Sequence, residues 1–278
     1  MVIGTTVTGA MTKMDPQSLD GRTAMVTGAS RGIGLAIALG LVKHGAHVVM
    51  AGRQIETLEL ARRNLEEQGV SQESCSLLSL DLSRGDDIDR VTAELGDRDI
   101  DILVNNAGVM LPAESFLDRD WSAWERILQI NFTGPARLCH AFGSQMVARN
   151  WGRIINIASI AGLAGPQGNV EYGTSKAALI GFTRNLAVEL AASGVTVNAV
   201  APGKVETLSV GQRRGTLEYQ ERLRSVPTGR FVMPEEVVDV VMFLASPMAS
   251  QITGQTMVVD GGEIAAGPYA ARLTDSDE

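Results

Sequence analysis

Short runs of β-branched and other apolar residues alternate along the chain with longer segments in which apolar residues recur every three to four positions. The runs predict seven strands, at Thr23–Thr27, His47–Ala51, Cys75–Leu80, Ile100–Asn105, Arg153–Ala158, Val195–Val200 and Thr256–Val259. Helices are expected between them, near residues 33–44, 54–68, 86–95, 118–130, 133–149, 173–192 and 234–245. Because the strands are continuously apolar and separated by helices, the pattern predicts a doubly wound α/β fold. Its sheet is expected to be predominantly parallel and seven-stranded, with helices on both faces.

The same pattern sets the domain boundaries. No internal repeat or Pro/Ser-rich linker divides residues 19–262, so a single domain is expected there. Residues 1–18 lack a pattern and are expected to form a flexible arm, and residues 263–278 are expected to form a C-terminal tail. Residues 204–226 carry many charges and interrupt a short crossover. They are either a lid over a ligand or a solvated surface helix.

Composition narrows the functional classes. The formal charge of −8 argues against general nucleic-acid binding, which requires a basic surface. No apolar run is long enough to span a membrane and no secretory signal is evident, so a cytoplasmic protein is expected. The two cysteines, Cys75 and Cys139, lie far apart outside any metal-binding motif and are expected to be buried thiols. No metal site is predicted.

A glycine-rich turn follows the first predicted strand and opens the first helix. It reads Thr27-Gly28-Ala29-Ser30-Arg31-Gly32-Ile33-Gly34. Such glycines allow a tight turn and let backbone N–H groups approach a pyrophosphate at the helix N-terminus. Tight packing of helix on strand also selects glycine. The position of this turn at the first strand–helix junction nevertheless favours nucleotide binding. The cofactor-binding residues predicted here are Gly28, Ser30, Arg31, Gly32, Ile33 and Gly34.

The end of the second strand indicates which dinucleotide binds. An NAD site usually places Asp or Glu there to bind the ribose hydroxyls. This strand instead continues into Gly52 and Arg53, and no acid occurs before Glu56. A guanidinium pairs with a 2′-phosphate, whereas a carboxylate repels it. Arg53, together with Arg31, therefore predicts NADP(H) in preference to NAD(H). The alternative is that both arginines are merely exposed near helix starts.

A tyrosine and a lysine are spaced for proton transfer. Tyr172 and Lys176 lie one helical turn apart in a chain with only three tyrosines and four lysines. Ketone reduction delivers hydride to carbon and a proton to oxygen, and a phenol with a pKa near 10 is a poor proton donor at neutral pH. A nearby ammonium is expected to lower the pKa of Tyr172. Ser159, which ends the fifth strand, is expected to polarise the substrate oxygen.

These motifs together resemble the classical short-chain dehydrogenase/reductase family, which has a Rossmann-type fold. The resemblance runs from about Leu19 to Gly262 and includes the TGxxxGxG spacing, Asn105-Asn106-Ala107-Gly108, Tyr172-x-x-x-Lys176 and Val259-Asp260-Gly261-Gly262. It implies that Lys176 also holds the nicotinamide ribose. It further implies cofactor contacts by Asp81, Leu82, Asn105, Ala107, Gly108, Tyr172, Pro202, Gly203, Val205 and Thr207. Lys204 departs from the smaller or apolar residue that is usual at its position.

The resemblance also identifies Asn131 as a fourth catalytic residue. Pro135 supports this assignment physically, because proline has no N–H for the Asn131 carbonyl four residues earlier. The helix is expected to bend there. The freed carbonyl is expected to hold a water, and the resemblance implies that this carbonyl helps to relay protons to Lys176.

The function predicted is reversible hydride transfer between NADP(H) and a carbonyl or secondary alcohol, by a homodimer or homotetramer. The alternatives are a 3-oxoacyl-[acyl-carrier-protein] reductase and a non-catalytic nucleotide-binding sensor; an extended epimerase or dehydratase is disfavoured by the TGxxxGxG spacing. An acidic carrier protein would require basic residues at the site entrance. Arg137 is a candidate, but Ser193 occupies a position that is often basic in carrier-protein reductases. A small free ketone, sugar or cyclic alcohol is therefore favoured.

Overall fold

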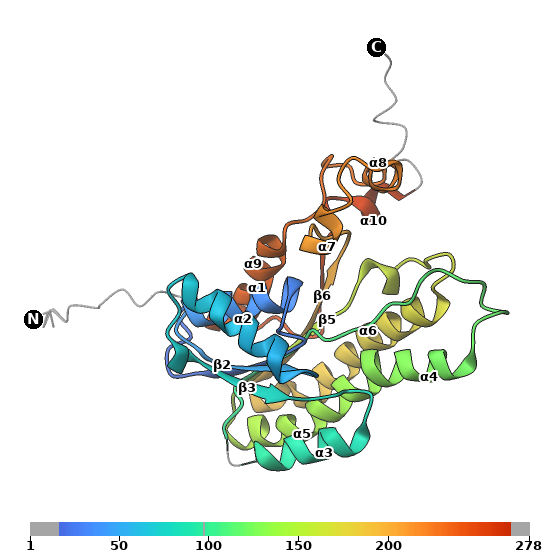
Figure 1. The fold of residues 1–278 in the computed structure, drawn as a ribbon. Helices are drawn as coiled ribbons and strands as arrows, with labels where there is room; N and C mark the ends of the chain where they lie inside the picture. Colours follow the sequence, from blue (N-terminus) through green and yellow to red (C-terminus); the bar gives the residue numbers. More distant parts are fainter. Residues whose placement is uncertain (1–16, 97, 268–278) are drawn as a thin grey trace, which may run out of the picture.

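A parallel sheet forms the centre of the computed structural model, which describes residues 17–96 and 98–267 (Figure 1). Within these residues the strands are β1 (Thr23–Thr27), β2 (His47–Gly52), β3 (Cys75–Ser79), β4 (Ile102–Asn105), β5 (Gly152–Ile157), β6 (Val195–Pro202) and β7 (Thr256–Val259). Their order is β3-β2-β1-β4-β5-β6-β7, and every neighbouring pair is parallel. The predicted fold class is confirmed.

Helices cover both faces of this sheet. The helices of the described residues are α1 (Gly32–Lys43), α2 (Ile55–Glu67), α3 (Gly85–Glu94), α4 (Trp121–Leu128), α5 (Gly134–Ala148), α6 (Val170–Leu190), α7 (Leu208–Gly211), α8 (Leu217–Arg224), α9 (Pro234–Ala245) and α10 (Glu263–Ala266). Two large hydrophobic clusters fill most of the interior. One packs α1, α2 and α9 on one face, and the other packs α3, α5 and α6 on the opposite face (Figure 1). Among the described residues, no helix has the length and hydrophobicity that a membrane span requires.

The order of the strands reverses beside β1. The chain moves outward from β1 to β2 and β3, then returns to β4 on the other side of β1. Crossover connections therefore leave in opposite directions from the carboxyl ends of β1 and β4. In open parallel sheets this arrangement opens a crevice between neighbouring loops, where ligands bind.

Helix starts differ from the sequence-based expectation in two informative places. Helix α4 begins at Trp121 rather than near residue 118, because the Asp120 carboxylate accepts the N–H of Ser122 at 3.1 Å and caps the helix. Helix α6 begins at Val170, three residues earlier than expected. Tyr172 therefore lies within its first turn.

A π-helical turn, Gln129–Thr133, joins α4 to α5 where a bend is expected. The Gly134 N–H donates to the carbonyl of Gln129, five residues earlier. Because Pro135 lacks an N–H, a regular α-helix would leave the Asn131 carbonyl without its usual donor. The wider turn shifts the hydrogen-bond register at this point.

The domain continues beyond its expected boundary at residue 262. Glu263 begins α10, and its carboxylate pairs with the Lys204 ammonium and accepts a hydrogen bond from Ser225 at 3.0 Å. Residues 263–267 therefore pack against the domain instead of starting a separate tail. The rest of the expected tail, and residues 1–16 of the expected arm, lie outside the described residues.

Candidate active site

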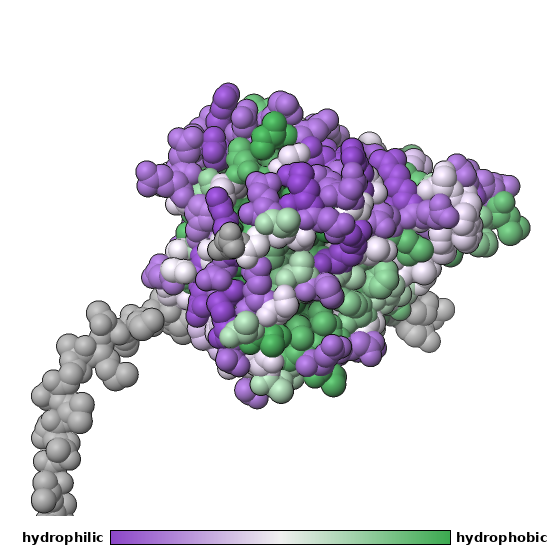
Figure 2. All heavy atoms as spheres, turned by 90° about the horizontal axis from the view of Figure 1, so that it is seen from below, coloured by the Kyte–Doolittle hydropathy of each residue, from purple (hydrophilic) through white to green (hydrophobic). Residues whose placement is uncertain are grey.

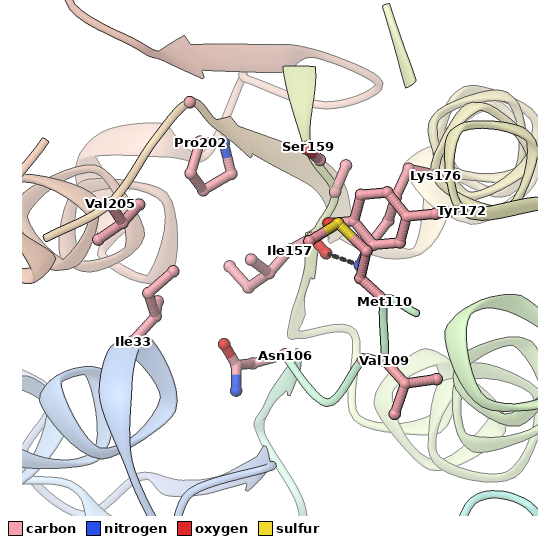
Figure 3. Close-up of a pocket in the computed structure, with 13 residues that line it drawn as sticks. Ile33, Asn106, Val109, Met110, Ile157, Ser159, Tyr172, Lys176, Pro202 and Val205 are labelled. Carbon is pink, nitrogen blue, oxygen red and sulfur yellow. Dashed lines mark hydrogen bonds between the residues drawn. The ribbon is translucent and has the colours of Figure 1, made fainter. Parts of the chain in front are cut away.

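Two adjoining cavities lie at the carboxyl edge of the sheet. The larger, of about 760 Å³, extends along the loops after β1, β2, β3 and β4. The smaller, of about 250 Å³, contains Ser159, Tyr172 and Lys176 (Figure 3). Ile33, Asn106, Gly108 and Val109 line both. The cavities are thus parts of one cleft, long enough for an extended ligand whose reactive end reaches the smaller part.

The floor of the larger cavity is backbone. Gly28 has a left-handed φ of 66°, and a Cβ at Gly34 would lie 2.3 Å from the Gly28 carbonyl oxygen. Side chains are excluded here, so a ligand can approach the first N–H groups of α1. All the residues predicted in this turn line the cavity, namely Gly28, Ser30, Arg31, Gly32, Ile33 and Gly34. The cradle fits a pyrophosphate.

Two arginines stand at the adenosine end of this cleft. Arg31 and Arg53 both line the larger cavity, and both are exposed. The acid that lines it, Asp81, is held by Ser83, whose backbone N–H and hydroxyl donate to it at 2.9 and 2.7 Å. Positive charge at the end of β2, where an NAD site needs a carboxylate, fits the 2′-phosphate of NADP.

The two asparagines at the end of β4 make different contacts. Asn105 was expected to contact the cofactor, but its side chain is buried and donates to Asn156 Oδ1 at 2.9 Å and Cys139 Sγ at 3.3 Å. Asn106 instead lines both cavities and donates to the carbonyl of Thr27 at 2.9 Å. The four-residue motif identified the turn, but only the strand's facing decided which amide reaches the cleft.

Tyr172, Ser159 and Lys176 converge in the smaller cavity from β5 and α6 (Figure 3). Ser159 follows β5, and its hydroxyl accepts the Ala161 N–H at 3.1 Å. Lys176 is 4% exposed, and its ammonium donates to the carbonyl of Ile157 at 2.8 Å. The ammonium lies 5.9 Å from the centre of the Tyr172 ring. The predicted trio therefore lies on one wall of one cavity.

Burial is the largest cause of the pKa shifts of Tyr172 and Lys176. It raises the pKa of Tyr172, and a hydrogen bond with Ser159 opposes that rise. Burial also lowers the pKa of Lys176 to about 8. The lowered pKa expected for Tyr172 is not found in the chain itself. The reason is that burial disfavours the charged phenolate, and this desolvation outweighs the hydrogen bond with Ser159.

Asn131 connects two segments of the site through hydrogen bonds. It is fully buried, and its amide exchanges hydrogen bonds with the backbone of Val109 at 2.8 and 2.9 Å. It also donates to the Ser175 hydroxyl at 3.0 Å. Because Val109 follows β4 and Ser175 lies on α6, Asn131 holds two walls of the site together. Its side chain does not line either cavity, and the water relay through its carbonyl stays a prediction.

Four further predicted residues lie at the end of β6 and just after it. Pro202, Gly203 and Val205 line the smaller cavity, and Thr207 lines the larger. A Cβ at Gly203 would lie 2.8 Å from the Cβ of Asp260, so glycine is required where β6 meets the turn after β7. The loop after β6 therefore borders both parts of the cleft.

The segment at residues 204–226 contains two short helices, α7 and α8, above this loop. Its polar contacts were not foreseen. The Glu206 carboxylate accepts hydrogen bonds from Arg214 Nε at 2.7 Å and from the Tyr219 hydroxyl at 2.8 Å. Lys204 is tied to Ser225 at 2.7 Å. The only feature of the sequence that pointed to these contacts was the high density of charged residues. Which side chains pair with one another depends on how the segment folds back on itself.

Both cysteines are buried, as expected from the sequence. Cys75 and Cys139 are free and buried, and burial raises their pKa values to about 11 and about 12. Such thiols are poor nucleophiles. No cluster of His, Cys, Asp or Glu suited to a metal occurs among the residues described.

Comparison with known proteins agrees with this geometry. A family model described as enoyl-(acyl carrier protein) reductase matches residues 28–263. The 3-oxoacyl-[acyl-carrier-protein] reductase FabG of Aquifex aeolicus is 40% identical over 249 residues, which span 88% of this chain and 98% of that protein. The corresponding reductase of Vibrio cholerae is 39% identical over 253 residues, spanning 88% and 98%.

Solved structures extend the comparison. A putative NAD(P)-dependent gluconate 5-dehydrogenase from Beutenbergia cavernae, with bound NADP, has a TM-score of 0.84 and 38% identity, over 90% of this chain and 100% of that chain. A gluconate 5-dehydrogenase from Burkholderia cenocepacia, in complex with NADP and tartrate, has a TM-score of 0.83 and 30% identity, over 91% and 99%. The chain therefore belongs to the short-chain dehydrogenase/reductase family, and it is an oxidoreductase that acts on an alcohol or carbonyl group.

Proposed function

We propose that the protein is an NADP(H)-dependent ketoreductase and alcohol dehydrogenase that acts on a small, uncharged, free substrate. The observation that carries this is the placement of Ser159, Tyr172 and Lys176 on one wall of the smaller cavity. That cavity continues into a glycine-floored cleft with two arginines at its far end. A dinucleotide in this cleft would end beside the trio.

The residues of the chain divide the work of ketone reduction. Bound NADPH supplies the hydride that reaches the carbonyl carbon. The Tyr172 hydroxyl is protonated at neutral pH, since the ordinary pKa of a phenol is about 10 and burial raises it further, and it donates the proton to the carbonyl oxygen. Ser159 hydrogen-bonds that oxygen and stabilises the charge that develops on it. Lys176 keeps a positive charge near the site until the pH rises through its lowered pKa of about 8. In alcohol oxidation Tyr172 takes the proton back.

The names of the relatives indicate two substrate classes, an acyl chain on a carrier protein and a gluconate. The smaller cavity favours neither. Lys176 is the one charged side chain among the described residues that line it, and its ammonium is engaged by the Ile157 carbonyl. A hexonate carboxylate would therefore lack a cation there. Arg137, the candidate for an acidic carrier protein, is paired with Asp89. An uncharged ketone, sugar or cyclic alcohol requires neither a cation in the cavity nor a free Arg137.

The test is a substrate panel read by NADPH consumption. The panel contains acyclic and cyclic ketones, neutral ketoses, a keto-hexonate and an acetoacetyl-carrier protein, each with NADPH and with NADH. We expect the fastest turnover with an uncharged ketone and NADPH, and none in the Tyr172→Phe variant. A preference for the carrier-bound thioester would establish the 3-oxoacyl reductase alternative, which the FabG relatives support. NADPH binding without turnover on any substrate would favour the sensor.

We further propose that the enzyme is a cytoplasmic homodimer or homotetramer. Figure 2 views the side formed by α3–α6, where hydrophobic patches interrupt a largely polar surface. In the segment before α4, Phe116 and Leu117 are 46% and 89% exposed. Val188 on α6 is 82% exposed. Where exposed apolar groups form a contiguous patch, the patch marks an association surface. Light scattering after gel filtration tests this, with Val188→Glu expected to weaken association. Cell fractionation tests the location.

A further inference from the structure

A buried acid directly precedes the tyrosine of the site. Glu171 lies in the first turn of α6, and its side chain is 1% exposed. Its carboxylate lies 3.3 Å from a terminal nitrogen of Arg119, a side chain that is 7% exposed. Neither residue lines the cavities. Removing two charges from water is costly, so a buried pair of this kind requires compensating contacts.

The compensating contacts of Arg119 come from three segments. One terminal nitrogen lies 2.8 Å from the Glu114 carboxylate. The other donates to the carbonyl of Pro112 at 2.7 Å and to that of Gly168 at 3.4 Å, besides facing Glu171. A planar guanidinium can serve several acceptors at fixed angles, which the ammonium of lysine cannot. Arg119 therefore joins the segment after β4, the loop before α6 and the first turn of α6.

Two of these segments, the one after β4 and the first turn of α6, contribute residues to the wall of the smaller cavity. The segment after β4 carries Met110, which lines the cavity beside Tyr172 (Figure 3). It contacts the loop before α6 directly, because the Glu114 N–H donates to the Gly168 carbonyl at 2.9 Å. Gly168 has a φ of 73°, and a Cβ there would lie 2.9 Å from the Cβ of Ala113. The contact leaves no room for a side chain.

Both members of the pair are attached to helix starts. Arg119 immediately precedes Asp120, the cap of α4. Glu171 places its negative charge in the first turn of α6, where the helix dipole favours it. The ion pair therefore fixes the start of one helix relative to the start of the other. Tyr172 is the next residue after Glu171, so its backbone position follows from that link.

We propose that Arg119 and Glu171 are a positioning pair for hydride transfer. The pair holds the first turn of α6, and with it the Tyr172 hydroxyl, against the wall that carries Met110. The proposal rests on the carbonyl chemistry proposed above. It assigns the pair no contact with substrate or cofactor. Its effect is on how closely the hydroxyl meets the carbonyl oxygen.

Kinetics provide the first test, on the ketone that the wild type reduces fastest. Glu171→Gln removes the ion pair while keeping the side-chain volume. Because an error of about 1 Å at a reacting group costs up to about 100-fold in rate, kcat should fall by about 10- to 100-fold. The KM for NADPH should not change, since neither residue borders the cofactor cleft. Arg119→Lys should retain more activity than Arg119→Met.

A matched control separates positioning from stability. Arg149 is also a partly buried arginine, and it joins Asp99 at 2.7 Å and the Ile100 carbonyl at 2.9 Å near the start of β4, at the opposite edge of the sheet. Arg149→Met should lower the thermal midpoint and leave kcat unchanged. The double variant Arg119→Met/Glu171→Met leaves no unpaired buried charge. It should lose no more rate than the worse single variant, because the two residues act as one unit.

Hydrogen exchange provides a second test that needs no substrate. In Glu171→Gln, peptides covering residues 109–119 and 165–176 should exchange faster, whereas peptides from the glycine turn after β1 should not. Unchanged exchange in these peptides would overturn the proposal even if the panel contained no substrate. So would normal kcat in Glu171→Gln and in the double variant, combined with a lowered thermal midpoint, because the pair would then serve stability alone.

Discussion

The two ends of the cleft are built from different parts of the chain. At the cofactor end the glycine turn presents its backbone to the cleft, and the shape of that turn depends on places where no Cβ can stand, such as Gly34. At the substrate end the surface consists of side chains, and buried polar contacts such as Lys176 with Ile157, or Arg119 with Glu171, set their positions. At the cofactor end few amino-acid substitutions would preserve the shape of the backbone. At the substrate end a side chain can change while the backbone keeps its path.

This difference predicts which measurement responds to a substitution at each end. At the cofactor end the response should appear in cofactor affinity and in the packing of α1 on the sheet. At the substrate end it should appear in kcat, with the fold intact. The predictions below test this separation, beginning with the largest expected effect.

Tyr172→Phe removes the proton donor and leaves the ring in place. Because general acid catalysis contributes about 100- to 10,000-fold, kcat should fall by that factor while the thermal midpoint is retained. Steady-state kinetics and thermal unfolding measure the two quantities. Tyr219→Phe is the matched control, since that hydroxyl binds Glu206 outside the trio. Residual activity near the wild-type level in Tyr172→Phe would remove Tyr172 from the mechanism.

Lys176→Met should reveal the cost of the buried ammonium. Burial lowers the pKa of Lys176 from 10.5 to about 8 in the folded chain. Between these two values the unfolded chain binds the proton and the folded chain does not, so the wild type gains stability as the pH rises through this window. Relative to Lys176→Met, the gain should approach about 3 kcal/mol in the free energy of unfolding. Denaturant titrations from pH 7 to pH 10 measure it. Parallel curves for the two proteins would contradict it.

Gly34→Ala should damage the cofactor end. The added Cβ would lie 2.3 Å from the Gly28 carbonyl oxygen, which is backbone and cannot turn away. Overpacking of this kind costs about 1–3 kcal/mol, so the Kd for NADPH should rise by about 10- to 100-fold. Fluorescence titration measures it. At Gly181 of α6 a Cβ would meet nothing within 4 Å, so Gly181→Ala should bind NADPH normally. Equal affinities in the two variants would remove the distinction between the ends.

Arg53→Ala should have the smallest effect, because the guanidinium is exposed and solvent screens it. We expect the KM for NADPH to rise about 10-fold, the order of one charge-assisted hydrogen bond, with the KM for NADH unchanged. Adding Gly52→Asp should reverse the cofactor preference. Arg63→Ala, an exposed arginine on α2 outside the cleft, is the control. If KM rose equally for both cofactors, Arg53 would not recognise the 2′-phosphate.

The strands were predictable because each buried run is continuously apolar and bounded by polar residues. The predicted strand ends agree with the structure within a few residues. For example, β4 begins at Ile102 rather than Ile100; the carboxylate of Asp101, just before it, accepts the Thr23 N–H at 3.0 Å. Helix starts were less predictable. The early start of α6 at Val170 places Glu171 in the helix, and an acid before a tyrosine does not by itself indicate a buried pair.

The site divides in the same way. Tyr172 and Lys176 were predictable because four residues make one helical turn. The choice between Asn105 and Asn106 was not, because strand facing at the last residue of β4 decides it. The titration of Tyr172 was also not predictable, since it depends on burial and on the hydrogen bond with Ser159.

The sequence by itself therefore determined the order of strands and helices, the glycine turn, the absence of an acid after β2, and the Tyr172–Lys176 pair. Each of these depends on neighbours along the chain or on one regular repeat. Only the tertiary structure decided what Lys176 contacts, which asparagine reaches the cleft, and that Arg119 meets Glu171 fifty-two positions later. These depend on packing between distant segments, where burial sets both the cost of a charge and the partners that offset it.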